Sequence, residues 1–250
     1  MRPNLRMMKN YRLKVFTDFD GTITKNDVWM SSVSRLIEDK EEFKNICEEL
    51  YSGKIGTRET VIRQLELVRD FSIERFNSYL DEEEIDEHFR DFAGFCRQNE
   101  IELTILSGGL DYYIDYILKR ENITVDFYSC KMIWDEKNKI LKSEFTYSDE
   151  YCRLCDTCKR NILINKTYDP ENEISVYIGD GSTDFCVSGY ADIVFAKGKL
   201  ASFCWKNNIT YFDYKDFSDV KSKLIKIMEK DKLKHRQEAK TRRRDVIMGG

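Results

Sequence analysis

Residues 13–22, Leu-Lys-Val-Phe-Thr-Asp-Phe-Asp-Gly-Thr, decide the fold of this chain. The run 13–17 is short, continuous and mostly apolar, as expected for a strand that is covered on both faces of a parallel sheet. Asp18 and Asp20 follow at once, with a glycine and a threonine behind them. One carboxylate can attack phosphorus, the other can move a proton, and both can share a magnesium ion. The stretch therefore predicts a strand end built for phosphoryl transfer.

Composition indicates a folded protein with one sizeable core. The chain has 250 residues, of which 41% are hydrophobic and 34% charged, and its net charge of −4 does not indicate a general nucleic-acid binder. No apolar run is long enough to span a membrane, and residues 1–12 lack the apolar core of a secretory signal. We therefore expect a cytoplasmic protein whose partner is a small phosphorylated metabolite, with no membrane and no nucleic acid. The oligomeric state is not predicted.

Three further strand-like runs, at 101–106, 174–178 and 193–195, are separated by helical patterns, which is the α/β arrangement. Polar residues follow the first two of these runs, as they follow 13–17. In open parallel sheets, ligands bind beyond the carboxyl ends of the strands. The sequence thus predicts a parallel sheet flanked by helices, with polar groups from separate segments gathered at one edge.

Two excursions interrupt this core. Between the first two strands the sequence contains a long helical stretch, which we interpret as a cap with helices at 28–38, 41–51, 57–70, 73–80 and 85–99. Aromatic and β-branched residues around a polar turn predict a β-hairpin over 128–145. Further helices are expected at 159–166 and 216–232. The predicted domains are a core of 12–25 with 100–232, and a cap of 26–99.

The C-terminal segment is basic. Residues 231–250 hold seven Lys or Arg and three acidic residues. We predict a frayed, charged tail over 233–250. A localisation signal or an RNA contact is the alternative interpretation.

Each motif has a chemical role that suits its residue types. Asp18 is the candidate nucleophile, because a carboxylate is already ionised at neutral pH. Asp20 is the candidate general acid and base. Asp18 and Asp180 are expected side-chain ligands of Mg²⁺, with Asp184 directed at the same ion or its waters. An acidic N-cap at the start of a helix is the alternative interpretation of Asp184.

Four residues are candidates for binding the phosphoryl oxygens, through the hydroxyl and N–H of Thr22, the hydroxyl of Ser107, the N–H of Gly108 and the ammonium of Lys159. Hydroxyl and glycine N–H groups between a strand and a helix can form an anion site. Lysine offers a point charge to a phosphoryl group. An ordinary strand-to-helix turn at 107–109 is the alternative.

Cysteines are unusually dense just before Lys159. Cys152, Cys155 and Cys158 are spaced as zinc ligands can be, and Cys130 is a candidate fourth ligand. A structural zinc would hold Lys159 in place. The alternative is a loop of reduced, partly buried cysteines.

Taken together and in this order, these segments resemble the haloacid dehalogenase superfamily. The matching motifs are Asp18–Thr22, Ser107, Lys159 and 179–184. The resemblance implies a Rossmann-like sheet and a Mg²⁺-dependent aspartyl-phosphate mechanism. It also implies that Asp20 gives its backbone carbonyl to the metal.

The helical insert resembles the small cap of the phosphoserine-phosphatase-like subgroup. Within that subgroup the chain is similar to the phosphatases of methionine salvage that act on 2-hydroxy-3-keto-5-methylthiopentenyl-1-phosphate, through 22–27, 106–109 and 152–159. By the same resemblance, Asp27 and Arg63 are candidate substrate contacts. A phosphoserine phosphatase is the alternative enzyme. A non-enzymatic module that binds a phosphometabolite or RNA is the alternative of another class.

Overall fold

The computed structural model describes residues 11–152, 154–169, 171–229 and 233–249. Within these residues, strands form one sheet in the order β4-β3-β2-β1-β5-β6-β7. The strands are β1 (Arg12–Thr17), β2 (Glu102–Leu110), β3 (Asp126–Asp135), β4 (Ile140–Glu144), β5 (Glu173–Gly179), β6 (Ile193–Ala196) and β7 (Phe212–Asp213).

The predicted α/β class with a mostly parallel sheet is confirmed. β1 pairs with β5 in parallel, from Arg12 opposite Glu173 to Thr17 opposite Ile178. β6 continues the parallel pairing on β5, and β7 adds to β6. Every residue of β5 is buried, which explains its continuous apolar pattern. The sequence did not predict β7, which has only two residues.

The contacts of the chain divide it into two compact units. The first unit contains the described residues up to Thr17, Asp86–Thr104, and those from Arg160 onward. The second unit contains Asp18–Ile85 and Ile105–Lys159. The division of the sequence into a core and a cap of 26–99 stays a prediction.

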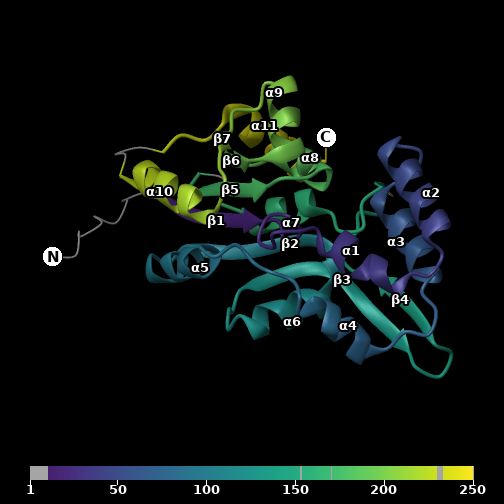
Figure 1. Cartoon of the computed structure of the whole chain (residues 1–250). Coiled ribbons are helices and arrows are strands. Elements are labelled where there is room, and N and C mark those ends of the chain that lie inside the picture. Colours follow the sequence, from purple (N-terminus) through teal and green to yellow (C-terminus); the bar gives the residue numbers. More distant parts are fainter. Residues whose placement is uncertain (1–10, 153, 170, 230–232, 250) are drawn as a thin grey trace. The chain divides into compact units, whose positions relative to one another are not determined.

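The first unit holds β1, β5, β6 and β7 together with helices that cover them (Figure 1). Phe217, at the start of α10, packs on Phe89 and Phe92 of α5, with ring centroids 4.8 and 5.1 Å apart. Helix α10 begins after Asp216, whose carboxylate accepts from the backbone N–H of Ser218 and Asp219. The helices of this unit are α5 (Phe89–Gln98), α7 (Lys159–Lys166, from Arg160), η2 (Ser182–Asp184), α8 (Phe185–Ser188), α9 (Gly198–Lys206), α10 (Phe217–Met228) and α11 (Gln237–Ile247).

The second unit combines short helices with the predicted hairpin. β3 and β4 pair antiparallel from Lys131 opposite Glu144 to Asp135 opposite Ile140, which confirms the hairpin. Figure 1 shows α6 running beside the hairpin strands, and α2 beside α3. Aspartate or serine side chains cap several of these helices at the N-terminus, as Asp39 and Ser72 do. The helices are α1 (Val28–Ser31), η1 (Val33–Leu36), α2 (Lys40–Tyr51), α3 (Thr57–Glu66), α4 (Ile73–Leu80) and α6 (Asp111–Arg120).

Several predicted helices differ in extent from the observed ones: the helix expected at 57–70, for example, ends at Glu66. The single helix expected at 28–38 is a short α-helix followed by a 3₁₀ turn, because the backbone is already irregular at Ser32. The helix expected at 85–99 begins only at Phe89. The end of the helix expected at 216–232 falls partly outside the described residues.

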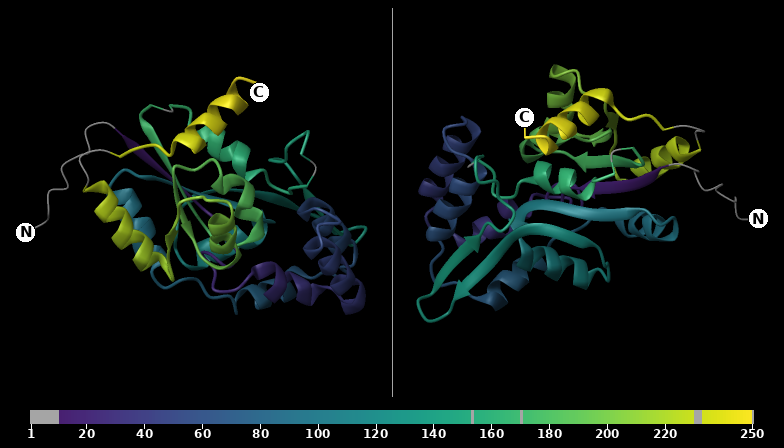
Figure 2. Two further views of the ribbon diagram at one scale, coloured as in Figure 1. Left: turned by 90° about the horizontal axis from the view of Figure 1, so that it is seen from above. Right: turned by 180° about the vertical axis from the view of Figure 1, so that it is seen from behind.

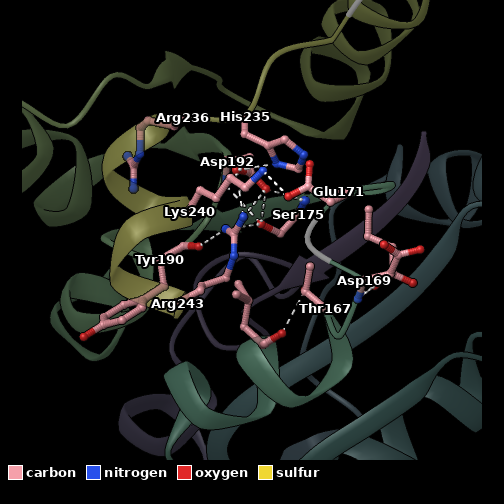
Figure 3. A network of polar contacts seen from close by, with 12 residues as sticks. Thr167, Asp169, Glu171, Ser175, Tyr190, Asp192, His235, Arg236, Lys240 and Arg243 are labelled. Carbon is pink, nitrogen blue, oxygen red and sulfur yellow. Dashed lines mark hydrogen bonds and ion pairs between the residues drawn. The ribbon is translucent and has the colours of Figure 1, made fainter. Parts of the chain in front are cut away.

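The prediction of a frayed tail over 233–250 is wrong for its described part. Helix α11 buries Ala239 and Arg243, and Figure 2 shows it in yellow against the green segments of the first unit. Arg243 donates from Nη2 to both carboxylate oxygens of Asp192 at 3.0 Å, and from Nη1 to Ser175 Oγ at 3.1 Å. His235 hydrogen-bonds with the same carboxylate (Figure 3). A buried ion pair thus fixes this segment, although its composition is that of a solvated tail.

No helix in the described part of the chain is both long and apolar enough to cross a bilayer.

Candidate active site

The stretch after β1 forms a tight turn at the start of the second unit. Gly21 has φ of 74°, a left-handed conformation that glycine adopts without strain. The carbonyl of Phe19 accepts from the backbone N–H groups of Ile23 and Thr24, and from the Thr24 hydroxyl. Phe19 itself is fully buried. These bonds lock the backbone that presents Asp18 and Asp20.

Asp18 is paired with Lys159. The Lys159 ammonium donates to Oδ1 of Asp18 over 2.7 Å, and the two side chains are 3% and 6% exposed respectively. Lys159 opens α7, at the point where the cysteine-rich segment ends. Two segments that are far apart in the sequence therefore bring a carboxylate and its counter-charge together.

The carboxyl group of Asp20 is held by three donors. Ser107 Oγ donates to Oδ2 at 3.1 Å, and the Val28 N–H donates to Oδ1 at 3.2 Å. The Tyr113 hydroxyl lies 3.1 Å from Oδ1 and 3.0 Å from Oδ2. When Asp20 carries a proton, a hydroxyl can turn to accept from it, whereas the Val28 N–H can only donate. The arrangement can therefore hold both protonation states.

Burial, and after it the nearby charge of Asp27, raise the pKa of Asp20 from 3.8 to about 7. Hydrogen bonds from Tyr113 and Ser107 and the charge of Lys159 act in the opposite direction, and they stabilise the ionised form. A carboxylic acid poised near neutrality can give and take a proton under ordinary conditions.

The Ser-Gly-Gly segment at the end of β2 has a structural role that its sequence did not suggest. Ser107 Oγ accepts from the N–H of Gly109 while it donates to Asp20. A Cβ on Gly108 would lie 2.7 Å from a carboxylate oxygen of Asp156. Asp156 is buried, which raises its pKa. Gly108 therefore makes room for a second carboxyl group in this unit.

The remaining candidates in the second unit lie on its turns and helices. Thr22 is buried within the turn after β1. Asp27 caps α1 and accepts from the Met30 N–H at 3.2 Å. Arg63, in the last turn of α3, forms ion pairs with Glu42, Glu49 and Glu59. The substrate contacts assigned to Asp27 and Arg63 stay predictions.

Asp180 and Asp184 lie on the turn after β5, in the first unit. Oδ2 of Asp184 accepts from the N–H groups of Asp180 and Gly181 at 3.0 Å, and Oδ1 accepts from the Tyr177 hydroxyl at 2.5 Å. Asp184 thus fixes the turn that presents Asp180. Thr17 lies opposite Ile178 in the β1–β5 register. In the sequence, Asp18 directly follows β1 and Asp180 directly follows β5.

The structure does not support the predicted zinc site. Among the described residues, no three of Cys130, Cys152, Cys155 and Cys158 offer sulfur atoms to a common ion. Protein contacts hold the loop instead: Arg58 Nε donates to the carbonyl of Cys155 at 3.1 Å, and the Thr57 hydroxyl donates to that of Leu154 at 3.3 Å. Cys130 Sγ lies 3.5 Å from the Thr157 hydroxyl.

The sequence did not identify Tyr113 and Asp156 as parts of this site. Tyr113 looks like one of several apolar residues on α6, and Asp156 like a polar residue of a loop. The only available signals were the adjacent glycines, Gly108 and Gly109, because both leave space for these side chains.

Comparison with known proteins defines the class. A family model described as "Putative Phosphatase" matches residues 13–200. The 2-hydroxy-3-keto-5-methylthiopentenyl-1-phosphate phosphatase of Bacillus cereus (strain AH820) is 32% identical over 221 residues, which cover 87% of this chain and 98% of that relative. The same enzyme of Bacillus anthracis has the same identity and coverage.

Solved structures show the same fold. A phospho-aspartyl intermediate analogue of phosphoserine phosphatase superposes with a TM-score of 0.65 at 19% identity, over 86% of this chain and 99% of that one. Phosphoserine phosphatase from T. onnurineus gives a TM-score of 0.61 at 16% identity, over 94% and 99%. These neighbours share the fold of this chain. The chain belongs to the phosphatase family whose model it matches.

Proposed function

We propose that this protein is a Mg²⁺-dependent phosphatase that hydrolyses a small phosphorylated metabolite through an aspartyl-phosphate on Asp18. The observation that carries the proposal is the pair of differently held carboxylates after β1. Asp18 is bonded to a lysine, whereas Asp20 sits among hydroxyl and N–H donors with a pKa of about 7. Two carboxyl groups in such different environments can take different roles in one reaction.

In the first half of the reaction, Asp18 attacks phosphorus and Asp20 gives its proton to the leaving oxygen as the P–O bond breaks. Lys159, Ser107, Thr22 and the N–H of Gly108 bind the phosphoryl oxygens. The ammonium of Lys159 offsets the repulsion between the attacking carboxylate and the anionic phosphate. In the second half, Asp20 takes a proton from water, which attacks the aspartyl-phosphate and releases inorganic phosphate.

The donor set suits magnesium. Carboxylate and carbonyl oxygens are the ligands that Mg²⁺ prefers, and it takes few of them from protein. We assign the Asp18 and Asp180 carboxylates and the Asp20 carbonyl to the ion, which would neutralise charge on the phosphate. Both oxygens of Asp184 already accept hydrogen bonds within the first unit, so it would act by fixing Asp180 or through water.

Phosphate release from 4-nitrophenyl phosphate tests the chemistry. The unmodified protein should turn it over with Mg²⁺, and Asp18→Asn should abolish turnover while the circular dichroism spectrum stays that of the folded protein. Asp213→Asn, an exposed aspartate at the end of β7, is the matched control and should keep full activity. Activity that survives Asp18→Asn would refute the assignment of Asp18 as the nucleophile.

We propose 2-hydroxy-3-keto-5-methylthiopentenyl-1-phosphate as the substrate. Relatives that are 32% identical and matched over nearly their whole length support this choice. Phosphoserine is the second candidate, because solved phosphoserine phosphatases share the fold. Side-by-side kcat/KM values on the two compounds decide between them, and a higher value for phosphoserine would contradict our assignment.

A further inference from the structure

Tyr113 is a fully buried phenol inside the second unit, and its hydroxyl contacts both oxygens of Asp20. It lies in the first turn of α6. A phenol keeps its proton at neutral pH, so this hydroxyl can donate a hydrogen bond to Asp20. The proposed mechanism gives Tyr113 no role.

The surroundings of Tyr113 are shaped to bring its hydroxyl to Asp20. A Cβ on Gly109 would lie 1.6 Å from the Tyr113 oxygen, so only glycine leaves room for the phenol at that position. The ring packs near Phe19, with centroids 6.2 Å apart. The Asp111 carboxylate accepts from the N–H of Met132 at 2.7 Å, which fixes the start of α6 on β3. The hydroxyl is therefore placed by rigid neighbours.

We propose that Tyr113 is a positioning residue that holds the Asp20 carboxyl group in the orientation for proton transfer. The inference rests on the proposed function, in which Asp20 acts as general acid and base. Val28 contacts only Oδ1 and Ser107 only Oδ2, whereas Tyr113 lies within hydrogen-bond distance of both oxygens. It therefore resists rotation of the carboxyl plane in either direction. Small misplacements of a reacting group can cost about 10²-fold in rate.

The proton balance leaves Tyr113 unchanged. As the bond from phosphorus to the leaving oxygen breaks, that oxygen takes the electron pair and receives the proton of Asp20. Asp20 is left as a carboxylate, which accepts from Tyr113 and Val28 while the Ser107 hydroxyl binds the phosphoryl group. The attacking water later returns a proton to Asp20. Tyr113 keeps its own proton throughout, so its effect must act through Asp20.

Two aryl phosphates separate this role from a structural one. The leaving group of 4-nitrophenyl phosphate departs readily without a proton, whereas that of phenyl phosphate depends more on the general acid. We expect Tyr113→Phe to lower kcat/KM by about tenfold or more for phenyl phosphate and by under about threefold for 4-nitrophenyl phosphate. Tyr112→Phe is the matched control, because that hydroxyl bonds to Asn77 at 2.6 Å, and it should change neither value.

A double-mutant cycle gives a second readout. In the Asp20→Asn background, adding Tyr113→Phe should change kcat/KM for phenyl phosphate by less than about twofold, because residues that act through one another are not additive. An equal loss for both substrates, or the same loss with and without Asp20, would overturn the inference, even if Tyr113→Phe weakens the fold. If the unmodified protein releases no phosphate from either compound, the proposed function itself fails.

Discussion

Lys159 donates a 2.7 Å hydrogen bond to Asp18, and both side chains are almost completely removed from solvent. An ammonium buried beside a carboxylate is held in one place by that charge. An incoming phosphoryl group would meet a lysine that is already aligned with the nucleophile. The ion pair therefore fixes the position of Lys159 before any substrate binds.

Replacing Lys159 by methionine should lower kcat/KM for 4-nitrophenyl phosphate by about 10²–10³-fold, since loss of one oxyanion donor costs that much elsewhere. Lys166→Met is the matched control on the same helix, where the lysine pairs with Glu102 at 2.9 Å. The control should keep nearly full activity. Similar losses of kcat/KM in both variants would show that the effect comes from disturbing the helix and not from removing the charge of Lys159.

Asp27→Asn should lower the pKa of Asp20. Burial is the largest cause of the rise to about 7, and the charge of Asp27 is the next. Carboxyl NMR titration of the Mg²⁺-free protein measures the change. Asp39→Asn removes a comparable helix-capping aspartate on α2 and should leave the titration of Asp20 unaltered. An unchanged pKa in Asp27→Asn would contradict the assigned cause.

The raised pKa of Asp20 also affects stability. Because the folded state binds this proton more tightly, the contribution is complete below the unfolded value near 3.8 and is lost as pH rises through about 7. Urea unfolding of the Mg²⁺-free protein should therefore show a loss of unfolding free energy across this range. The loss should be smaller in Asp20→Asn.

Arg243→Met should destabilise the first unit by about 3–5 kcal/mol, because it leaves the buried carboxylate of Asp192 without its main counter-charge. Arg244→Met is the neighbouring control, with a side chain that is 74% exposed. It should change the free energy of unfolding by under about 0.5 kcal/mol. Urea denaturation measures the free energy of unfolding of both variants. Equal losses in the two would contradict a specific role for the ion pair between Arg243 and Asp192.

Acid should weaken the same contact. Burial alone would raise the pKa of Asp192, but the hydrogen bond with His235 and the charge of Arg243 prevail and lower it. A lowered folded pKa contributes stability above the unfolded value of 3.8, and that stability is lost as pH falls below it. Asp192→Asn should therefore lose less stability than the unmodified protein on acidification from about pH 5 to 3.

Chelation should abolish activity, and added Mg²⁺ should restore it. Asp180→Asn should weaken Mg²⁺ binding by about tenfold or more, measured by calorimetry, because it removes an anionic oxygen from the ion. Asp213→Asn, an exposed aspartate on β7, should bind Mg²⁺ like the unmodified protein. Full activity in the presence of excess chelator would refute the metal requirement.

The strands could be predicted because their patterns are local. The buried run of β5 and the polar turn after it are readable from neighbouring residues alone. The same holds for the turn at Asp18–Thr22, whose glycine and acidic residues specify its geometry.

Several contacts between distant segments could not be predicted. Tyr113 differs from its apolar neighbours on α6 only by a hydroxyl, and its partner Asp20 is 93 positions away. Arg243 lies between two other arginines in the sequence, and nothing in the sequence distinguishes it from them. The structure shows that Arg243 is buried and bonded to Asp192. The cysteine spacing could not show that Arg58 and Thr57, from the helical insert, bond to the backbone of the cysteine-rich loop.

The ion pair between Asp192 and Arg243 also constrains the order of events on the ribosome. Asp192 is synthesised first, and its counter-charge follows 51 positions later. Until α11 has emerged, the nascent chain carries a carboxylate without its arginine counter-charge, at a site that the finished unit buries. We therefore expect this unit to reach its full stability only after the arginine has been synthesised.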